Sequence, residues 1–456
     1  MKKLFNLTIG FIIIALVFTS CNNGESKSNS ALSSNVAEKV YVAPGQHDEF
    51  YAFISGGFSG QLSVYGLPSG RLFKVIPVFS QDAEKAWGYN EETKPMLNTS
   101  HGFIPWDDSH HPDISQTAGK LDGRYIYINA NNTPRIAKID LTTFETTEII
   151  EIPNSAGNHS SSFVTENTEY VVAGTRFSVP IPQRDMSIKD YKGNFKGSLS
   201  FLKVNPENGG MSIKFQILMP GFDYDLSHPG RGKSHGWFFF TTYNTEEANS
   251  LLEVNASQND KDFIAAINWK KIEEYVNNGG GTKMPTNYAH NVYSEESHTA
   301  TSTMINEVLT VNPLDVPGAV YFLPTPKSPH GCDVDPTGEY IVGNGKLSAN
   351  LTVHSFTKML DAIELAIEAN PPRDRRNMIN HGTLIHPDDY KRFKELGVYY
   401  ETTGAWSTND PLMLEITTVR LGEERREIMY PTRAIHEAGG KVAFGSDWPV
   451  SGYISE

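Results

Sequence analysis

Short segments of alternating apolar and polar residues recur through the first three quarters of the chain. Residues 122–129 read Asp-Gly-Arg-Tyr-Ile-Tyr-Ile-Asn, and further alternating segments follow at 135–140 and 147–152. A period of two is typical of strands that bury one face, and the turn-forming residues between the segments favour tight connections. Related segments occur at 336–342 and 351–354. The pattern predicts small antiparallel sheets.

Units of this kind repeat from about residue 46 to residue 355. Repeated antiparallel units favour a β-propeller, in which small sheets are arranged around a central channel. Their spacing is long and uneven, so it leaves the number of blades open. A β-sandwich is the alternative architecture for the same pattern.

The pattern changes near residue 357. Between 357 and 370, Leu360, Ile363 and Ile367 share one helical face, and a pair of prolines then ends the helix. Strands are then predicted at 378–385, from 398 and at 441–444, and helices at 387–397 and near 423–438. Strands that alternate with helices indicate α/β architecture. A boundary between 354 and 370 therefore separates a β domain (46–355) from an α/β segment (356–456).

The N-terminus has the three parts of a bacterial export signal. Two lysines precede an apolar run at 11–18, which ends in Thr19-Ser20-Cys21. The run is short for a membrane span and typical of a signal peptide. We expect a signal peptide at 1–20, lipidation of Cys21, and a flexible tether at 21–45 that is rich in Ser and Asn near its start. A simple signal peptide with a coincidental cysteine is the alternative. Either would place the protein in the periplasm.

Charge and cysteine content narrow the function classes. The 456 residues carry a formal net charge of −14, which argues against binding to nucleic acid. The two cysteines are Cys21 and Cys332. If Cys21 carries lipid, the chain can form neither an internal disulfide nor a metal centre with two thiolates.

Several histidines lie in segments that resemble loops. His110 and His111 are adjacent, and His159 and His330 stand singly among Gly, Pro, Asn and Ser. In a propeller, loops from successive blades meet at one end of the channel, so imidazoles far apart in sequence can meet in space. Imidazole suits copper, zinc and iron. The alternative is that these are ordinary polar surface residues.

The motifs around these histidines resemble those of nitrous oxide reductases. They are Asp-x-x-His-His-Pro at 107–112, His159, Pro-His-Gly at 329–331 before a β unit with Gly-Lys-Leu-Ser at 345–348, and the segment 238–246. The resemblance covers roughly residues 46–355. It is closest to the branch of the family that is exported without a twin-arginine signal.

This resemblance implies a seven-bladed propeller and a four-copper, sulfide-bridged cluster held by seven histidines. His110, His111, His159 and His330 correspond to four of the seven. Tyr243, Glu246 and Asp262 correspond to a calcium site, although Ser328 stands where many members have Asn. The family reduces nitrous oxide with electrons from a periplasmic donor such as a c-type cytochrome, and it works as a homodimer.

Parts of the family pattern have no counterpart in this sequence. Three cluster histidines and a cupredoxin domain would follow the propeller, and the dicopper electron-entry site of that domain needs two cysteines. With Cys21 lipidated, Cys332 alone remains. The resemblance therefore implies an incomplete seven-bladed-type propeller without the dicopper site, and we expect that the isolated chain does not reduce nitrous oxide.

The last hundred residues resemble the C-terminal part of a metal-dependent amidohydrolase. The motifs are Asn-His-Gly at 380–382, His-Pro-Asp-Asp at 386–389, Leu-Gly-Glu-Glu-Arg at 421–425 and Gly-Ser-Asp-Trp-Pro-Val at 445–450. In that family's TIM-like barrel, His381 would bind metal and Asp447 would be ligand and general base. The early His-x-His pair is absent, so we expect an inactive α/β fragment and a fused or chimeric reading frame.

Three functions follow from these readings. The first is a copper oxidoreductase that is impaired, the second a non-catalytic, lipid-anchored propeller that binds a partner, and the third a metal-dependent amidohydrolase. Copper content separates the first from the second. The remaining histidines in the chain are interpreted as structural or surface residues: His47, His101, His228, His235, His290, His298, His354 and His436.

Overall fold

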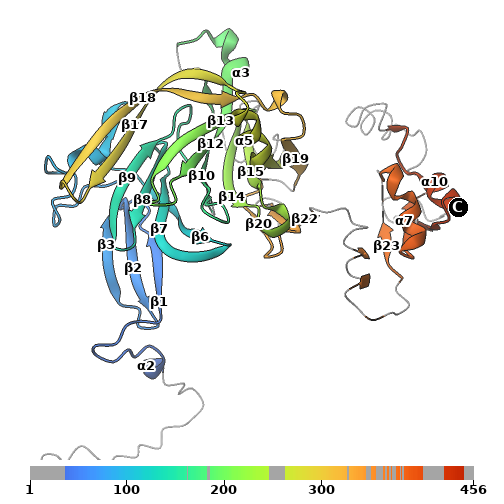
Figure 1. Ribbon diagram of the computed structural model, residues 1–456, viewed down its shortest axis with the longest axis horizontal. Helices are drawn as coiled ribbons and strands as arrows, with labels where there is room; N and C mark the ends of the chain where they lie inside the picture. Colours follow the sequence, from blue (N-terminus) through green and yellow to red (C-terminus); the bar gives the residue numbers. More distant parts are fainter. Residues whose placement is uncertain are drawn as a thin grey trace, which may run out of the picture. The chain divides into compact units, whose positions relative to one another are not determined.

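The computed structural model describes most of the chain between residues 36 and 445 (Figure 1). The described residues are 36–161, 163–181, 185–245, 262–325, 328–345, 351–355, 363–364, 367–368, 371, 376–380, 382, 385–403 and 426–445. Among them, no helix has the length and apolar character needed to cross a membrane. The chain divides into two compact units: one runs to Ile54 and includes Leu62–Val75, and the other comprises Ser55–Gln61 and everything from Ile76 onward.

The first unit is built on a three-stranded sheet in the order β1-β2-β3. Its elements are the short helix α2 (Val36–Lys39) and strands β1 (Phe50–Ser55), β2 (Gln61–Leu67) and β3 (Leu72–Pro77). In β2, Leu62 and Val64 are fully buried and their neighbours are partly exposed, which is the alternation of a strand with one covered face. Asp48 accepts hydrogen bonds from Ser69 and Arg71 and so fixes the turn between β2 and β3.

The second unit begins with a meander of four antiparallel strands. These are β6 (Ser109–Thr117), β7 (Lys120–Ala130), β8 (Arg135–Asp140) and β9 (Glu145–Glu151). The strands predicted at 122–129, 135–140 and 147–152 lie within or largely overlap β7, β8 and β9. The small ladder of β4 (Asn98–Thr99) and β5 (Gly102–Phe103) precedes this meander.

A second meander follows and is joined to the first by a long hairpin. It contains β10 (Tyr170–Gly174), β12 (Phe195–Val204) and β13 (Met211–Met219), with β11 (Val179–Pro180) and α3 (Tyr191–Asn194) beside them. In the hairpin, β17 (Thr282–Ser294) pairs antiparallel with β9, and β18 (Thr299–Val311) pairs parallel with β13. Together these strands form one sheet of ten strands.

Two further antiparallel sheets complete the β part. One has the order β14-β15-β16-β19, and the other has the order β20-β21-β22. Their strands are β14 (Phe222–Pro229), β15 (Trp237–Thr245), β16 (Phe263–Asn268), β19 (Val320–Pro324), β20 (Cys332–Val334), β21 (Tyr340–Asn344) and β22 (Leu351–Ser355), and helix α5 (Trp269–Asn277) follows β16. Successive small antiparallel sheets are the blades of an incomplete β-propeller, as the sequence predicts.

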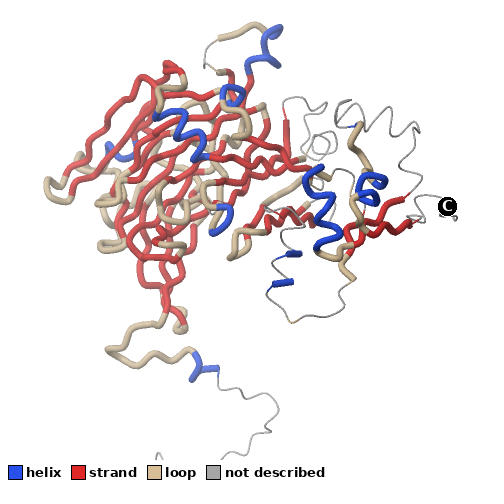
Figure 2. The backbone as a smooth tube through the Cα atoms, turned by 45° about the vertical axis from the view of Figure 1, so that its right-hand side comes forward, coloured by secondary structure: helices blue, strands red, loops and turns tan. Residues whose placement is uncertain are grey.

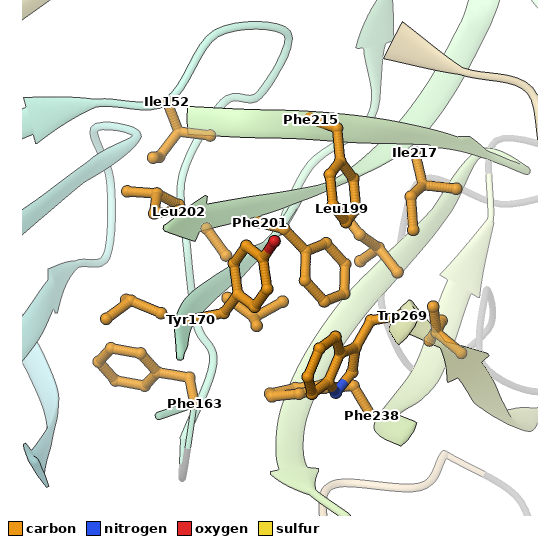
Figure 3. Close-up of a cluster of buried hydrophobic side chains, with 14 of the residues drawn as sticks. Ile152, Phe163, Tyr170, Leu199, Phe201, Leu202, Phe215, Ile217, Phe238 and Trp269 are labelled. Carbon is orange, nitrogen blue, oxygen red and sulfur yellow. The ribbon is translucent and has the colours of Figure 1, made fainter. Parts of the chain in front are cut away.

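Aromatic side chains form the centre of the second unit's core (Figure 3). Phe201 of β12 stacks on Phe215 of β13 with ring centroids 4.9 Å apart. Tyr170 meets Trp269 edge to face at 5.3 Å, which brings helix α5 onto the meander. Large apolar rings from β10, β12, β13, β15 and α5 therefore bind separate sheets into one core.

The C-terminal segment is α/β, as its sequence predicts (Figure 2). β23 (Met378–Asn380), β24 (Tyr399–Thr403) and β25 (Lys441–Gly445) form a parallel sheet, with helices α7 (Tyr390–Glu395) and α10 (Thr432–Glu437) between the strands. Its small core contains Ile379, Phe393, Val398, Tyr400 and Ile435. The strand predicted at 378–385 is shorter than expected, and the helix predicted at 387–397 begins as a 3-10 turn, η5 (Pro387–Asp389). The other 3-10 turns are η1 (Lys94–Leu97), η2 (Ile188–Asp190), η3 (Gly232–Ser234) and η4 (Pro313–Asp315).

Candidate metal centre

The four histidines singled out in the sequence come from three segments that are far apart along the chain. His110 and His111 lie at the start of β6, and His159 lies in the loop between β9 and β10. His330 precedes β20 by two residues. The first two segments belong to the ten-stranded sheet, and the third leads into the sheet β20-β21-β22.

A β-bulge brings His110 and His111 to the same side of β6. Neighbouring side chains on a regular strand point to opposite faces. Here the pairing of β6 with β7 shifts between His110 and Pro112, and His111 has a positive φ of 48°. A bulge redirects a side chain in this way, and the two rings end with their centroids 4.5 Å apart.

The structure brings all four rings together. The His111 and His159 Nε2 atoms are 3.2 Å apart. The ring centroids of His110 and His159 are 4.8 Å apart, and those of His159 and His330 are 5.8 Å apart. His159 is therefore the central ring of the group. Ligand atoms of His110, His111 and His159 lie within 4.8 Å of one another, and so do those of His159, Asp225 and His330.

Two buried aspartates hold the rings and were missed in the sequence. Asp225 of β14 contacts His159 through the ring's Nδ1, and its other oxygen lies 3.4 Å from His330 Nε2. Asp108 lies 3.3 Å from His110 Nδ1. A carboxylate at one ring nitrogen orients the ring and leaves the other nitrogen for a metal. In the sequence, Asp225 stands in a segment that forms strand β14. The structure buries most of this strand, and an unpaired charge there would be costly.

The environment keeps His111 neutral. Burial, together with the neighbouring charges of His159, His110 and His330, lowers the pKa of His111 to about 3. A neutral imidazole offers its lone pair to a metal without first losing a proton. Near neutral pH, the ring of His111 is therefore ready to act as a ligand.

Other site residues fall partly or wholly outside the described residues. Glu246 lies outside them, and of Tyr243 only the backbone is described, as part of β15. Asp262 is buried just before β16. The calcium site stays a prediction. His381 and Asp447, the two residues of the amidohydrolase resemblance, also lie outside the described residues.

Three other histidines in the described β part have protein partners of their own. His235 lies between Glu166, at 3.0 Å, and Glu169, at 3.3 Å. His290 of β17 pairs with Glu148 of β9 at 2.5 Å. Such contacts suit structural residues that join neighbouring segments.

His228 is the third, and its environment predicts a pH dependence of stability. It is buried in β14, where Nδ1 lies 2.7 Å from the Pro229 carbonyl oxygen and Nε2 lies 2.9 Å from Arg231 Nη2. This geometry requires a neutral ring that donates from Nδ1 and accepts at Nε2. Burial, with the charge of Arg231, lowers the pKa of His228 to about 4, although the bond to Pro229 opposes the shift.

Because the unfolded ring gains a proton near pH 6.5 and the folded ring only near pH 4, the protein should lose stability as pH falls through this window. The loss should approach ~1.4 kcal/mol per pH unit. Urea unfolding at pH 7.5 and pH 5 should show a smaller pH dependence in His228→Gln than in the parent. Equal dependence in both proteins would contradict this assignment.

Curated proteins named "Nitrous-oxide reductase" are similar to the chain. Over 343 residues the chain is 29% identical to "Nitrous-oxide reductase" from Pseudomonas fluorescens, with 74% of this chain and 49% of that protein covered. Over 345 residues it is 29% identical to the protein of the same name from Stutzerimonas stutzeri, with the same shares covered. The chain resembles nitrous-oxide reductases. It spans about half the length of these curated relatives.

A different family matches the C-terminal part. The model of the amidohydrolase family matches residues 351–455. The nitrous-oxide reductase alignments are more than three times as long as this segment, so most of their length lies before residue 351. The chain thus combines two resemblances, as its motifs indicate.

Solved structures give only a weak likeness. Kuenenia stuttgartiensis hydrazine synthase covers 67% of this chain and 80% of its own at 14% identity, with a TM-score of 0.32. This score is too low to bear on fold or function. The nitrous-oxide reductase resemblance therefore rests on sequence, and the geometry of the histidines is an independent observation.

Proposed function

We propose that the β part of the chain is a copper-binding domain of the nitrous-oxide reductase type, whose reduction of nitrous oxide is impaired in this chain. The observation that carries this proposal is the meeting of His110, His111, His159 and His330, with nitrogen atoms as close as 3.2 Å. These four residues are the ones that the resemblance to the family singles out. Copper is bound by imidazole in many proteins, so the donor set suits the metal.

The remaining groups near the site fit a centre bound by imidazoles alone. Cys332, which lies two residues after His330, is buried, and its Sγ lies 3.7 Å from the Phe239 carbonyl oxygen. Burial raises the pKa of this thiol, so it stays protonated and is a poor metal ligand. The carboxylates of Asp108 and Asp225 contact ring nitrogens and serve as orienting groups.

The reaction adds two electrons and two protons to nitrous oxide and gives dinitrogen and water. Bound copper would supply the electrons. The four histidines would hold it, and Asp108 and Asp225 would fix the directions of three of their rings, those of His110, His159 and His330. Since the described residues bring four imidazoles together where the family uses seven, we propose that turnover by this chain is strongly impaired.

We expect the purified chain to take up copper under anaerobic reconstitution but to show no robust nitrous oxide reduction with a reduced viologen donor. Metal analysis with optical spectroscopy, and consumption of the gas, measure the two parts. The exposed His101 provides a matched control, because His101→Ala should leave copper uptake unchanged. A parent that binds no copper would favour a non-catalytic propeller that binds a partner, and rapid turnover would overturn the proposed impairment.

We further propose that the protein resides in the periplasm, anchored through lipid on Cys21. The charged start, short apolar run and cysteine of the first 21 residues support this location. The family resemblance supports a c-type cytochrome as electron donor, a homodimer, and a calcium ion near Tyr243, Glu246 and Asp262.

A hydrolytic function of the C-terminal part is the second candidate, carried by the family match at 351–455. We propose that this part is inactive. The described residues of the segment form three parallel strands, whereas a barrel of this class closes eight strands around its site. Zinc retained by a His110→Ala/His111→Ala variant would instead support a hydrolytic metal site in the C-terminal part.

A further inference from the structure

A chain of polar contacts leads from Arg176 to the ring of His110. Arg176 follows β10, and its Nη1 donates to the side-chain oxygen of Asn131. Asn131 Nδ2 donates to Asp108 Oδ2 at 3.1 Å, and Asp108 Oδ1 lies 3.3 Å from His110 Nδ1. Four side chains from three separate segments are thus linked in series.

The chemistry of each group fixes the direction of this chain. A guanidinium can only donate and a carboxylate can only accept, so the amide of Asn131 must turn its oxygen to Arg176 and its nitrogen to Asp108. One oxygen of Asp108 is thereby held by the amide. The other oxygen then accepts from His110 Nδ1, and the lone pair of His110 is left on Nε2.

Backbone contacts tie the same residues to the loop that carries His159. The backbone N–H of Arg176 donates to the Gly157 carbonyl oxygen at 3.0 Å, two residues before His159. A Cβ at Gly157 would lie 2.6 Å from the Asn131 carbonyl oxygen, so the two segments pack closely. The backbone N–H of Asn131 donates to the Asp108 carbonyl oxygen at 3.0 Å. Arg176 therefore contacts the loop that carries His159 directly, and it is linked to the start of β6 through Asn131.

We propose that Asn131 and Arg176 are positioning residues that hold His110 in the tautomer protonated at Nδ1, so that Nε2 faces the metal. This inference rests on the proposed copper function. Without the guanidinium, the amide of Asn131 can rotate and release Asp108, and His110 then loses its fixed orientation. Neither residue belongs to the groups that could hold a metal ion.

Arg176→Met should weaken copper binding about tenfold, in the range known for residues one contact beyond a ligand. Arg176→Lys should recover part of the loss, because an ammonium can still donate to the Asn131 oxygen. Arg124→Met is the matched control, since Arg124 pairs with Asp122 on the surface of β7. Competition with a copper chelator measures affinity, and electron paramagnetic resonance of Cu(II) reports the bound nitrogens. Affinity and spectrum unchanged in Arg176→Met would overturn the proposal.

The tautomer can also be measured without metal. In copper-free protein labelled with ¹⁵N-histidine, with His110 assigned by His110→Gln, the ring should be protonated at Nδ1 in the parent and mixed in Arg176→Met and Asn131→Leu. The same tautomer in all three proteins would overturn the proposal. If the parent binds no copper, the proposed function fails, and this measurement still decides the role of Arg176.

Discussion

Replacing His159 with alanine should lower the copper affinity of the site more than ~100-fold, beyond the ~10–100-fold typical of outer-shell changes. His159 is the central ring: its Nε2 lies 3.2 Å from that of His111, and its ring lies near those of His110 and His330. Its removal also leaves Asp225, which is 1% exposed, without its closest partner. Chelator competition and metal content after anaerobic reconstitution measure the loss.

Two controls separate this effect from general damage. Asp225→Asn keeps the shape of the carboxylate and should weaken copper binding by about 10–100-fold. His101→Ala changes an exposed histidine that is not among the site's residues, so this variant should bind copper as the parent does. Copper retained by His159→Ala at parental affinity would show that the four rings are not the metal centre.

Phe201→Ala should lower the free energy of unfolding of the β part by about 3–5 kcal/mol. Phe201 is fully buried and packs against three other rings. Its ring centroid lies 4.9 Å from that of Phe215, 5.7 Å from that of Tyr170 and 6.3 Å from that of Phe238. These rings come from three strands besides its own, so the space left by the phenyl group cannot close without moving several elements. Chemical denaturation followed by far-ultraviolet circular dichroism measures the change.

The matched control is an apolar side chain in solvent. Leu314, in η4, is 83% exposed, so Leu314→Ala should change the free energy of unfolding by less than ~0.5 kcal/mol. A similar loss in both variants would mean that the aromatic cluster does not stabilise the fold as described.

Regular elements could be predicted from the sequence because their periodicity is local. The alternation at 122–152 gives β7, β8 and β9, and the change of pattern near 357 gives the parallel sheet β23-β24-β25. The hairpin β17-β18 was missed, and the parallel pairing of β18 with β13 depends on contacts between residues about a hundred positions apart.

The candidate site was predictable only in part. Its histidines stood out because they lie in recognisable motifs, whereas Asp225 and Asp108 act through positions that only the fold defines. The residues around His111 do not predict its positive φ, since residues other than glycine seldom adopt that conformation. The bulge follows from pairing with β7, and so it could not be read from β6 alone.

The hairpin β17-β18 has a consequence for the solubility of the β part. β9 and β13 are the last strands of their meanders, and without the hairpin each would present a row of free backbone N–H and C=O groups. Unpaired strand edges are templates for pairing with other chains and so promote aggregation. Because the hairpin β17-β18 pairs with both edges, it protects two meanders from pairing with strands of other chains.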